Sequence, residues 1–335
     1  MFGGSGSHRL LSRRRALALG GTVSGGLVAA STGAAFGASR LKSPLGAGAP
    51  IIRVGDEGGN TSLPVDQIQA ILQTQGNVSE SGVLSVEIDR DDLTNVTRNG
   101  VPWLPSFEVN GTAYFQALGD GRAILNGDFA LLDKEIDPFI DALLKNGLIF
   151  QAFHMHFYDL SPQMWHIHYR NIGDPLQLAQ ALFNSITQAT STPFPQPPPP
   201  QTTPLPADQL AQILGGSAEI GGDGVVTVSV ARADRVTLQG VPIAGDEGIE
   251  LSVAFEPLDN GQTVVAPDFS MTSREVMPVT RVMRQQGWDI NCLYNQETDE
   301  QPQLFFSHQV KIGDAVQLAR AVRNGANNTN LMFSS

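Results

Sequence analysis

The sequence predicts an α+β fold in two tandem repeats, each a mostly antiparallel sheet with helices packed on one side. The first observation is an internal duplication: the Gly-Val-Pro of residues 100–102 recurs at 240–242, and the Asp-Phe of residues 128–129 recurs at 268–269. Both matches have the same offset, so a whole unit is repeated rather than a single motif. The second observation is that each unit combines strand-like alternation with helix start and stop signals.

The first half of each unit is expected to contain a helix followed by strands. Residues 65–73 are predicted to form a short helix, and the Leu-Pro that precedes it at residues 63–64 recurs at 205–206. Alternating apolar and polar residues then predict three strands. These strands lie near residues 83–89, 112–117 and 122–126.

The second half of each unit is expected to contain a helix, a hairpin and a final helix. The first of these helices is predicted over residues 134–146, with Asp133 as its N-cap and Gly147 as its stop. A β-hairpin follows, because residues 149–157 and 163–170 both alternate as strands do. The last helix begins at Asp174-Pro175, since an acidic cap before proline is a start signal.

The first 37 residues have the features of an export signal. Three arginines at residues 13–15 precede an apolar, Gly-rich stretch at 16–30, and the small residues Ala35 and Gly37 offer a cleavage site. The Ser-Arg-Arg-Arg-Ala-Leu run resembles a twin-arginine signal. We therefore predict an exported protein, periplasmic or extracellular; an uncleaved basic helix and an ordinary secretion signal are the alternatives.

Five segments are predicted after the signal. They are a linker at 38–59, repeat one at 60–189, a proline-rich strap at 190–204, repeat two at 205–326 and a tail at 327–335. The proline density of the strap favours an extended polyproline II conformation. We therefore prefer a strap along the repeats to a flexible linker between independent domains.

Composition and motifs exclude several functional classes. The formal net charge of −12 disfavours a nucleic-acid partner, because phosphates repel an acidic protein. After the signal, no stretch is apolar enough to span a membrane. The single cysteine, Cys292, can form neither an internal disulfide nor a cysteine-based zinc site. There is also no Gly-x-Ser-x-Gly elbow, phosphate loop or dinucleotide fingerprint.

The predicted hairpin carries four of the chain's six histidines. His154 and His156 share a face of one strand, and His166 and His168 share a face of the other, because strand residues two apart point the same way. With the turn centred on Ser161, His154 would lie opposite His168, with Cβ atoms about 5 Å apart. A two-residue slip would keep all four imidazoles together. The opposite face is expected to be core; it carries Phe153, Met155, Phe157, Trp165, Ile167 and Tyr169.

Repeat two carries the same hairpin with different chemistry. Tyr294, Gln296 and Phe306 replace the first three histidines, and only the last histidine persists, as His308. The fold therefore does not need three of the four imidazoles, which points to a functional role. We expect a cavity on this face, lined by histidines in repeat one and filled by side chains in repeat two.

Three or four converging histidines point to a metal. Neutral imidazole is a common ligand, and zinc sites accept three histidines with an open fourth position. We therefore predict a divalent metal, with zinc first and copper as the alternative, since Met164 shares the histidine face. A surface histidine cluster or hydrogen-bonded histidines in a polar pocket are the alternatives without metal.

Candidate acid–base groups are Asp159, in the hairpin turn, and Glu135, before the central helix. Both recur in repeat two, as Asp299 and Glu275, where most of the histidines do not. Capping and packing roles explain such recurrence better than catalysis. The same argument applies to Asp128.

Repeat one also carries a series of motifs in fixed order. They are residues 126–132 (Asn-Gly-Asp-Phe-Ala-Leu-Leu), Glu135, Pro138, Asn146-Gly147, His154-x-His156, Pro162, His168-Tyr169 and Gly173-Asp174. This series resembles the LppY/LpqO family of bacterial exported proteins and lipoproteins, whose domain has no known function. The resemblance extends over both repeats, but it is weaker in repeat two.

The resemblance implies a metal set of His154, His156 and His168, with His166 as an addition or fourth ligand. It also implies export and a two-unit architecture, but no reaction. The chain departs from the family at Tyr294 and Gln296, and it lacks the lipoprotein cysteine.

Three functions follow as hypotheses. The first is an exported protein that binds a divalent metal or small ligand through repeat one, with an unknown small-molecule or cell-envelope partner. The second is a metal-dependent hydrolase that uses a metal-bound water, with Asp159 or Glu135 as proton acceptor. The third is a cell-envelope interaction domain without metal, in which the histidines respond to pH.

Overall fold

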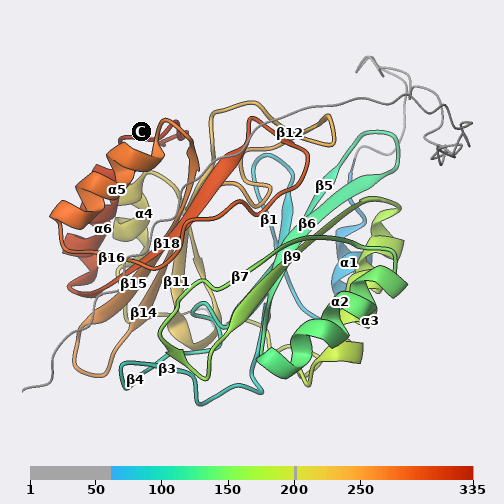
Figure 1. Ribbon diagram of the computed structural model, residues 1–335, viewed down its shortest axis with the longest axis horizontal. Coiled ribbons are helices and arrows are strands. Elements are labelled where there is room, and N and C mark those ends of the chain that lie inside the picture. The colour runs from blue at the N-terminus through green and yellow to red at the C-terminus, as the bar shows by residue number, and fades with distance from the viewer. Residues whose placement is uncertain (1–61, 200–201, 335) are drawn as a thin grey trace, which may run out of the picture. The chain divides into compact units, whose positions relative to one another are not determined.

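A computed structural model describes residues 62–199 and 202–334 (Figure 1). These residues belong to one compact unit. The predicted export signal and linker lie outside the described residues. No described helix is both long and apolar enough to cross a membrane.

Repeat one consists of a six-stranded antiparallel sheet, a small sheet and three α-helices. The helices are α1 (Val65–Leu72), α2 (Ile136–Lys145) and α3 (Pro175–Ala189), and the 3-10 turn η1 (Asp133–Glu135) precedes α2. The large sheet has the order β1 (Asn77–Val78), β2 (Leu84–Asp89), β5 (Asn110–Ala117), β6 (Ala123–Leu131), β9 (Trp165–Gly173) and β7 (Ile149–His154). The small sheet has the order β4 (Val101–Pro102), β3 (Thr97–Arg98) and β8 (Leu160–Ser161).

Repeat two has the same architecture. Its helices are α4 (Ala207–Leu214), α5 (Val276–Gln285) and α6 (Ala315–Ala326), with the short turn η2 (Gly222–Gly224). The large sheet has the order β10 (Ser217–Ile220), β11 (Val226–Val230), β14 (Leu251–Pro257), β15 (Thr263–Thr272), β18 (Leu304–Gly313) and β16 (Asp289–Ile290). The small sheet has the order β13 (Val241–Ile243), β12 (Val236–Leu238) and β17 (Glu300–Gln301). The predicted α+β fold in two tandem repeats is confirmed.

Local signals place the helices that support the histidine strands. The predicted start of α3 is correct, because the Asp174 carboxylate accepts hydrogen bonds from the backbone N–H groups of Leu176 and Gln177. The predicted N-cap of α2 is wrong, since Asp133 lies inside η1 and α2 begins at Ile136. Here the Glu135 carboxylate accepts the Leu132 N–H instead, 2.9 Å away.

The helices cover one face of each large sheet, and the other face packs against the other repeat. On β9, Ile167 and Tyr169 belong to the helix-side core of repeat one. Their neighbours His166 and His168 therefore point to the opposite face. On that side, two apolar clusters combine residues of both repeats. The histidines thus lie between the repeats, and the cavity beside them is also lined by residues of repeat two.

The histidine hairpin differs from its predicted register. His154 lies opposite His166, and Ala152 lies opposite His168, after a bulge at Gln151. The slip is a two-residue step, so the predicted common face is retained. Ser161 is not a turn centre, because it pairs with Thr97 in the small sheet. Pairing with a distant strand therefore overrides the local turn signal.

The apolar face of the hairpin is only partly core. Phe153 is 43% exposed, and its ring stacks on that of Trp165 with centroids 4.8 Å apart. Phe157 is buried, but in a cluster shared with repeat two. The prediction of a continuous core face is therefore wrong at these positions, since β7 is an edge strand and ends at His154.

Residues 194–196 of the proline-rich segment lie against repeat one. The Phe194 ring packs 5.0 Å from that of Phe183. The Gln196 backbone N–H donates to the Gln73 carbonyl, and its side chain bonds both backbone groups of Asp89. These contacts fix residues 194–196 to α1, β2 and α3.

Candidate metal centre between the repeats

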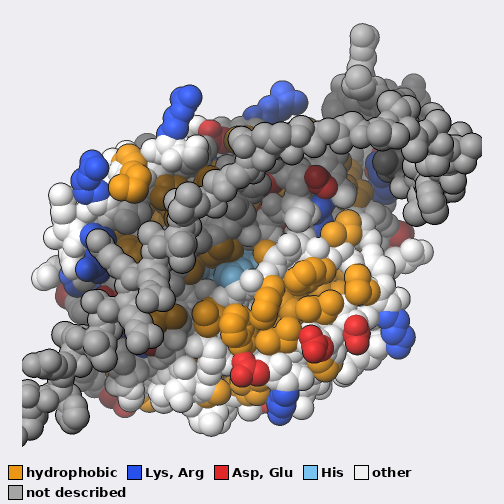
Figure 2. Space-filling view, viewed as in Figure 1, with side chains coloured by type: hydrophobic (Ala, Val, Ile, Leu, Met, Phe, Trp, Pro, Cys, Tyr) orange, Lys and Arg blue, Asp and Glu red, His pale blue; other side chains and the backbone are white. Residues whose placement is uncertain are grey.

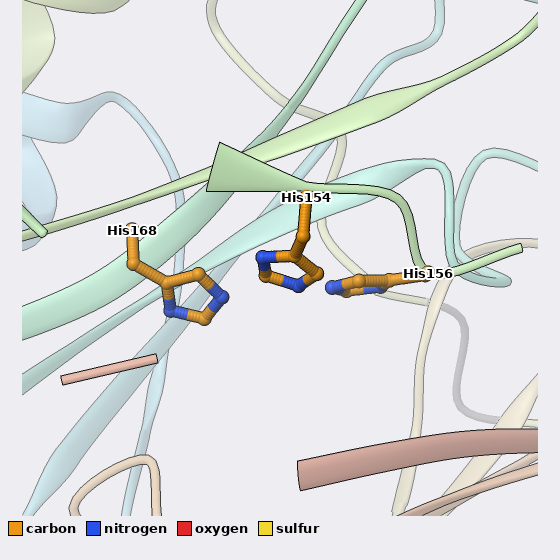
Figure 3. A group of neighbouring side chains, drawn as sticks. All are labelled: His154, His156 and His168. Atoms are coloured by element: carbon orange, nitrogen blue, oxygen red, sulfur yellow. The ribbon is translucent and has the colours of Figure 1, made fainter. Parts of the chain in front are cut away.

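Two neighbouring strands and the loop after one of them bring the four histidines together. His166 and His168 project from β9, His154 ends β7, and His156 follows in the loop. Figure 3 shows His154 between His168 and His156, with a ring nitrogen of each outer imidazole turned toward it. The ring centroids of His168 and His156 lie 5.0 and 5.1 Å from that of His154.

Five ring nitrogens in this cluster are buried without a hydrogen-bond partner among the described residues. They are Nδ1 and Nε2 of His154 and the Nε2 atoms of His156, His166 and His168. Leaving one buried polar atom unpaired costs about 1–3 kcal/mol. Buried polar groups in proteins are nearly always hydrogen-bonded, so this cluster is the candidate site for a ligand.

Two carboxylates of repeat one orient the imidazoles. Asp128 on β6 lies opposite His168 in register, and its Oδ2 atom is 2.8 Å from Nδ1 of His166. Glu108, in the loop before β5, has its Oε2 atom 3.2 Å from Nδ1 of His156. A carboxylate on one ring nitrogen leaves the other free to bind a metal.

Repeat two completes the site from the opposite side. The Nε2 atom of His308, on β18, lies 3.5 Å from Oε2 of Glu108. Its Nδ1 atom lies 3.7 Å from Oδ1 of Asp268 and 3.4 Å from Sγ of Cys292. The Tyr294 ring stacks on His154 with centroids 3.5 Å apart. The site therefore needs both repeats.

Burial sets the protonation states of this cluster. Burial lowers the pKa of His168 to about 4, and it lowers the pKa values of His154 and His156 well below their ordinary range. Burial also raises the pKa of Asp268 to about 8. Burial acts to raise the pKa of Asp128 too, but the hydrogen bond to His166 brings it below its ordinary value. The neutral imidazole that a metal requires is thus the favoured form.

A cavity of about 70 Å³ adjoins the cluster. Its wall combines His156, His168 and Asp128 with residues of repeat two, including Gly248 and Gln296. Histidine atoms are visible in a recess beside an apolar patch in Figure 2. Such a space holds a few water molecules or a small polar group.

The two candidate catalytic residues bind arginines elsewhere. The Glu135 carboxylate forms a buried, paired contact with the Arg90 guanidinium, at 2.9 and 3.0 Å. Asp159 accepts a hydrogen bond of 2.9 Å from Arg98. The carboxylates that contact the imidazoles are Asp128, Glu108 and Asp268 instead.

Sequence reasoning missed Glu108, Asp268 and the placement of His308. One signal was present: Glu108 has a positive φ of 62°, and its counterpart in repeat two is Gly248, with a φ of 72°. A bulky residue where the duplicate has a positive-φ glycine is unusual and warrants attention. Asp268 and His308 were overlooked because the same pair occurs in repeat one, as Asp128 and His168.

The donor set fits a divalent metal. Three overlapping groups each offer ligand atoms within 4.8 Å of one another. They are His154, His156 and His168; Glu108, His156 and His308; and Asp128, His156 and His166. Imidazole and carboxylate donors suit zinc and other first-row divalent ions.

Comparisons with known proteins give a family and two distant structural similarities. PduB, a trimeric bacterial microcompartment shell protein, is 11% identical over 77% of this chain and 97% of its own, with a TM-score of 0.21. EtuB from Clostridium kluyveri is 8% identical over 76% of this chain and 91% of its own, with a TM-score of 0.18. TM-scores this low support no conclusion, and no curated protein matches the chain. The domain of unknown function DUF1259 matches residues 66–188 and again 208–328, so the chain belongs to this family and carries its domain in two tandem copies.

Proposed function

We propose that this protein binds a divalent metal ion, with zinc as the first choice, through His154, His156 and His168. The observation that supports this proposal is the set of buried imidazole nitrogens without a protein partner. The carboxylates of Glu108 and Asp128 would orient the cluster, through His156 and His166. His166 is then a neighbour or fourth ligand, because Asp128 holds its Nδ1 atom and its Nε2 atom has no partner.

The cellular setting belongs to the same proposal. The basic and apolar N-terminal segment supports export, to the periplasm or the outside of the cell. The ordered motifs of repeat one support membership of the narrower LppY/LpqO group within the family. The partner would be a small molecule or a component of the cell envelope.

A metal-dependent hydrolase is the second candidate, and the cavity beside His156 and His168 favours it. A divalent ion, when bound, lowers the pKa of a coordinated water. The cavity leaves room for a small polar group, and Asp128 is the carboxylate on its wall. Asp128 would then accept a proton in place of Asp159 or Glu135.

Metal analysis of the purified protein tests the proposal. We expect zinc to co-purify or bind after dialysis, and to raise the midpoint of thermal unfolding; at 100 times Kd the stabilisation is about 2.7 kcal/mol. His154→Ala and His168→Ala should abolish binding at this centre. His156→Gln should abolish it without loss of fold, because Gln296 occupies this position in repeat two.

Asp159→Asn is the matched control, since Asp159 contacts Arg98 rather than the histidines. It should retain the metal. A protein that binds neither zinc nor copper, with no thermal shift, would rule out both metal-dependent candidates and favour an envelope interaction domain. Hydrolysis of ester and phosphoester substrates by the loaded protein, lost in Asp128→Asn with zinc retained, would separate the hydrolase from a binding protein.

A further inference from the structure

The contact between Glu108 and His308 joins the two repeats at the back of the histidine cluster. Glu108 comes from the loop before β5 in repeat one, and His308 comes from β18 in repeat two. The Nε2 atom of His308 and the Nδ1 atom of His156 both face the same Glu108 oxygen, at 3.5 and 3.2 Å. Among the described residues, the Glu108 carboxylate forms no ion pair with an arginine or lysine.

We infer that Glu108, His308 and the Nδ1 atom of His156 form a second divalent-cation centre, across the boundary between the repeats. The three residues offer ligand atoms within 4.8 Å of one another. A carboxylate with two imidazoles is a donor set that zinc accepts in open sites. This centre rests on the proposed function only through His156, which both ligand sets share.

The surroundings of His308 are those of a metal ligand. The His308 imidazole is buried, and its Nδ1 atom faces Asp268 and Cys292. The His308 backbone N–H donates to the Cys292 sulfur at 3.1 Å, which fixes the strand beside the ring. Ligating histidines commonly direct one ring nitrogen to a carboxylate and the other to the ion. In this arrangement Nε2 of His308 is the atom that faces Glu108.

The backbone at Glu108 supports the same assignment. A non-glycine residue in the left-handed region is disfavoured, and the duplicate has Gly248 at this position. The left-handed conformation therefore belongs to the fold, whereas the glutamate is particular to repeat one. Its side chain is 13% exposed, and its carboxylate is directed at two imidazoles. A bound cation would compensate this buried charge.

The two ring nitrogens of His156 face different neighbours, so the ring could bridge both centres. A neutral imidazole carries a proton on one nitrogen. The second cation would therefore displace the Nδ1 proton to water, and His156 would bridge as an imidazolate. Nδ1 faces Glu108, whereas Nε2 has no hydrogen-bond partner and lies on the side of Asp128, 3.9 Å away. The first centre would use Nε2 with His154 and His168. The second would use Nδ1 with Glu108 and His308.

Zinc titration of the full-length protein after removal of bound metal tests this inference, with elemental analysis to count ions. We expect two ions in the wild type and one in Glu108→Gln, Glu108→Gly and His308→Gln, with the second Kd raised about 100-fold or more. Glu108→Gly is the matched variant, because glycine suits the backbone and repeat two folds with it. His154→Ala should also retain one ion, but at the other centre.

The outcomes separate the two proposals. One ion in the wild type that persists in both Glu108 variants would overturn the second centre and leave the proposed function intact. One ion lost in the Glu108 variants but kept in His154→Ala would support the boundary centre and overturn the His154 ligand set. No bound ion in the wild type would overturn both.

Discussion

At the scale of single residues, Glu108 combines an unfavourable backbone with an acidic side chain in a buried site. Its φ of 62° lies in the left-handed region, which glycine adopts without steric cost but other residues do not. Burial is also the main cause that raises the pKa of this carboxyl well above its ordinary value. Both features disfavour the metal-free protein, as expected if the carboxylate is a ligand in the proposed second centre.

Glu108→Gly is therefore expected to stabilise the metal-free protein. Relief of the backbone should contribute about 1 kcal/mol to the free energy of unfolding. Urea denaturation in a chelator measures this quantity. With zinc present the order should reverse, because the wild type binds the additional ion.

Gln73 offers a matched control for the backbone contribution. It has a φ of 53°, is exposed, and corresponds to Gly215 in repeat two, with a φ of 76°. Gln73→Gly should give a similar gain with or without zinc. A metal-free Glu108→Gly protein less stable than the wild type would show that the carboxylate has a structural role instead.

At the scale of elements, one buried ion pair fixes the turn into the central helix of each repeat. Glu135 binds Arg90 in repeat one, and Glu275 binds Arg232 in repeat two at 3.0 Å. Each carboxylate also accepts a backbone N–H at the start of its turn, from Leu132 or Thr272. The recurrence of Glu135 thus has a structural explanation, as its presence in both repeats predicts.

Glu135→Gln should destabilise the protein by about 3 kcal/mol, because it leaves the buried Arg90 guanidinium with one partner fewer. Chemical denaturation measures this loss. Glu275→Gln, which makes the same change in repeat two, should have a comparable effect. Zinc binding should be unchanged in both variants. Loss of zinc binding in Glu135→Gln alone would show that Glu135 takes part in the metal site.

Local sequence signals predicted elements better than they predicted strand pairing. The α3 start at Asp174 and the strands around β2 and β5 could be predicted, because caps and alternation are local properties. The hairpin register could not, since Ser161 pairs with Thr97, a residue far away in the chain. The prediction that the histidines share one face was correct, because side chains alternate along a strand and a two-residue slip leaves each on the same face.

At the scale of the whole molecule, each repeat covers the sheet of the other. One boundary cluster places Trp103 and Phe107 of repeat one with Val264 and Val310 of repeat two. A second places Ile124 of repeat one with residues of the small sheet of repeat two. The two repeats therefore form a single site.

The position of the site between the repeats explains which of its residues can be recognised by comparing the sequences of the two repeats. Residues that repeat two lacks, such as His154 and His156, could be selected from the sequence as candidate site residues. The pairs Asp128–His168 and Asp268–His308 recur, so they resembled structural residues. In the structure both pairs face the same boundary, and recurrence there reflects a shared site.

Buried carboxylates make the stability of the whole molecule depend on pH. Burial raises the pKa of Glu256 and Glu297 to about 8 and that of Glu250 and Glu300 to about 7. Each group therefore holds its proton in the folded state at a pH where the unfolded chain has released it. Because the folded state binds more protons, the free energy of unfolding falls as pH rises from about 4.5 to 8.

We expect the metal-free protein to be more stable at pH 5 than at pH 8, with Glu256 alone contributing a difference on the order of 3 kcal/mol. Glu256→Gln should match the wild type near pH 5 and exceed its stability at pH 8, because the amide stays uncharged. Urea denaturation in chelator at both pH values measures the effect. Glu80→Gln, at an exposed position, is the control for the change in net charge. It should leave the slope of unfolding free energy against pH unchanged. Equal slopes of unfolding free energy against pH for the wild type and Glu256→Gln would mean that Glu256 ionises in the folded protein at its ordinary pKa. Its carboxylate would then be hydrated in solution rather than buried on β14.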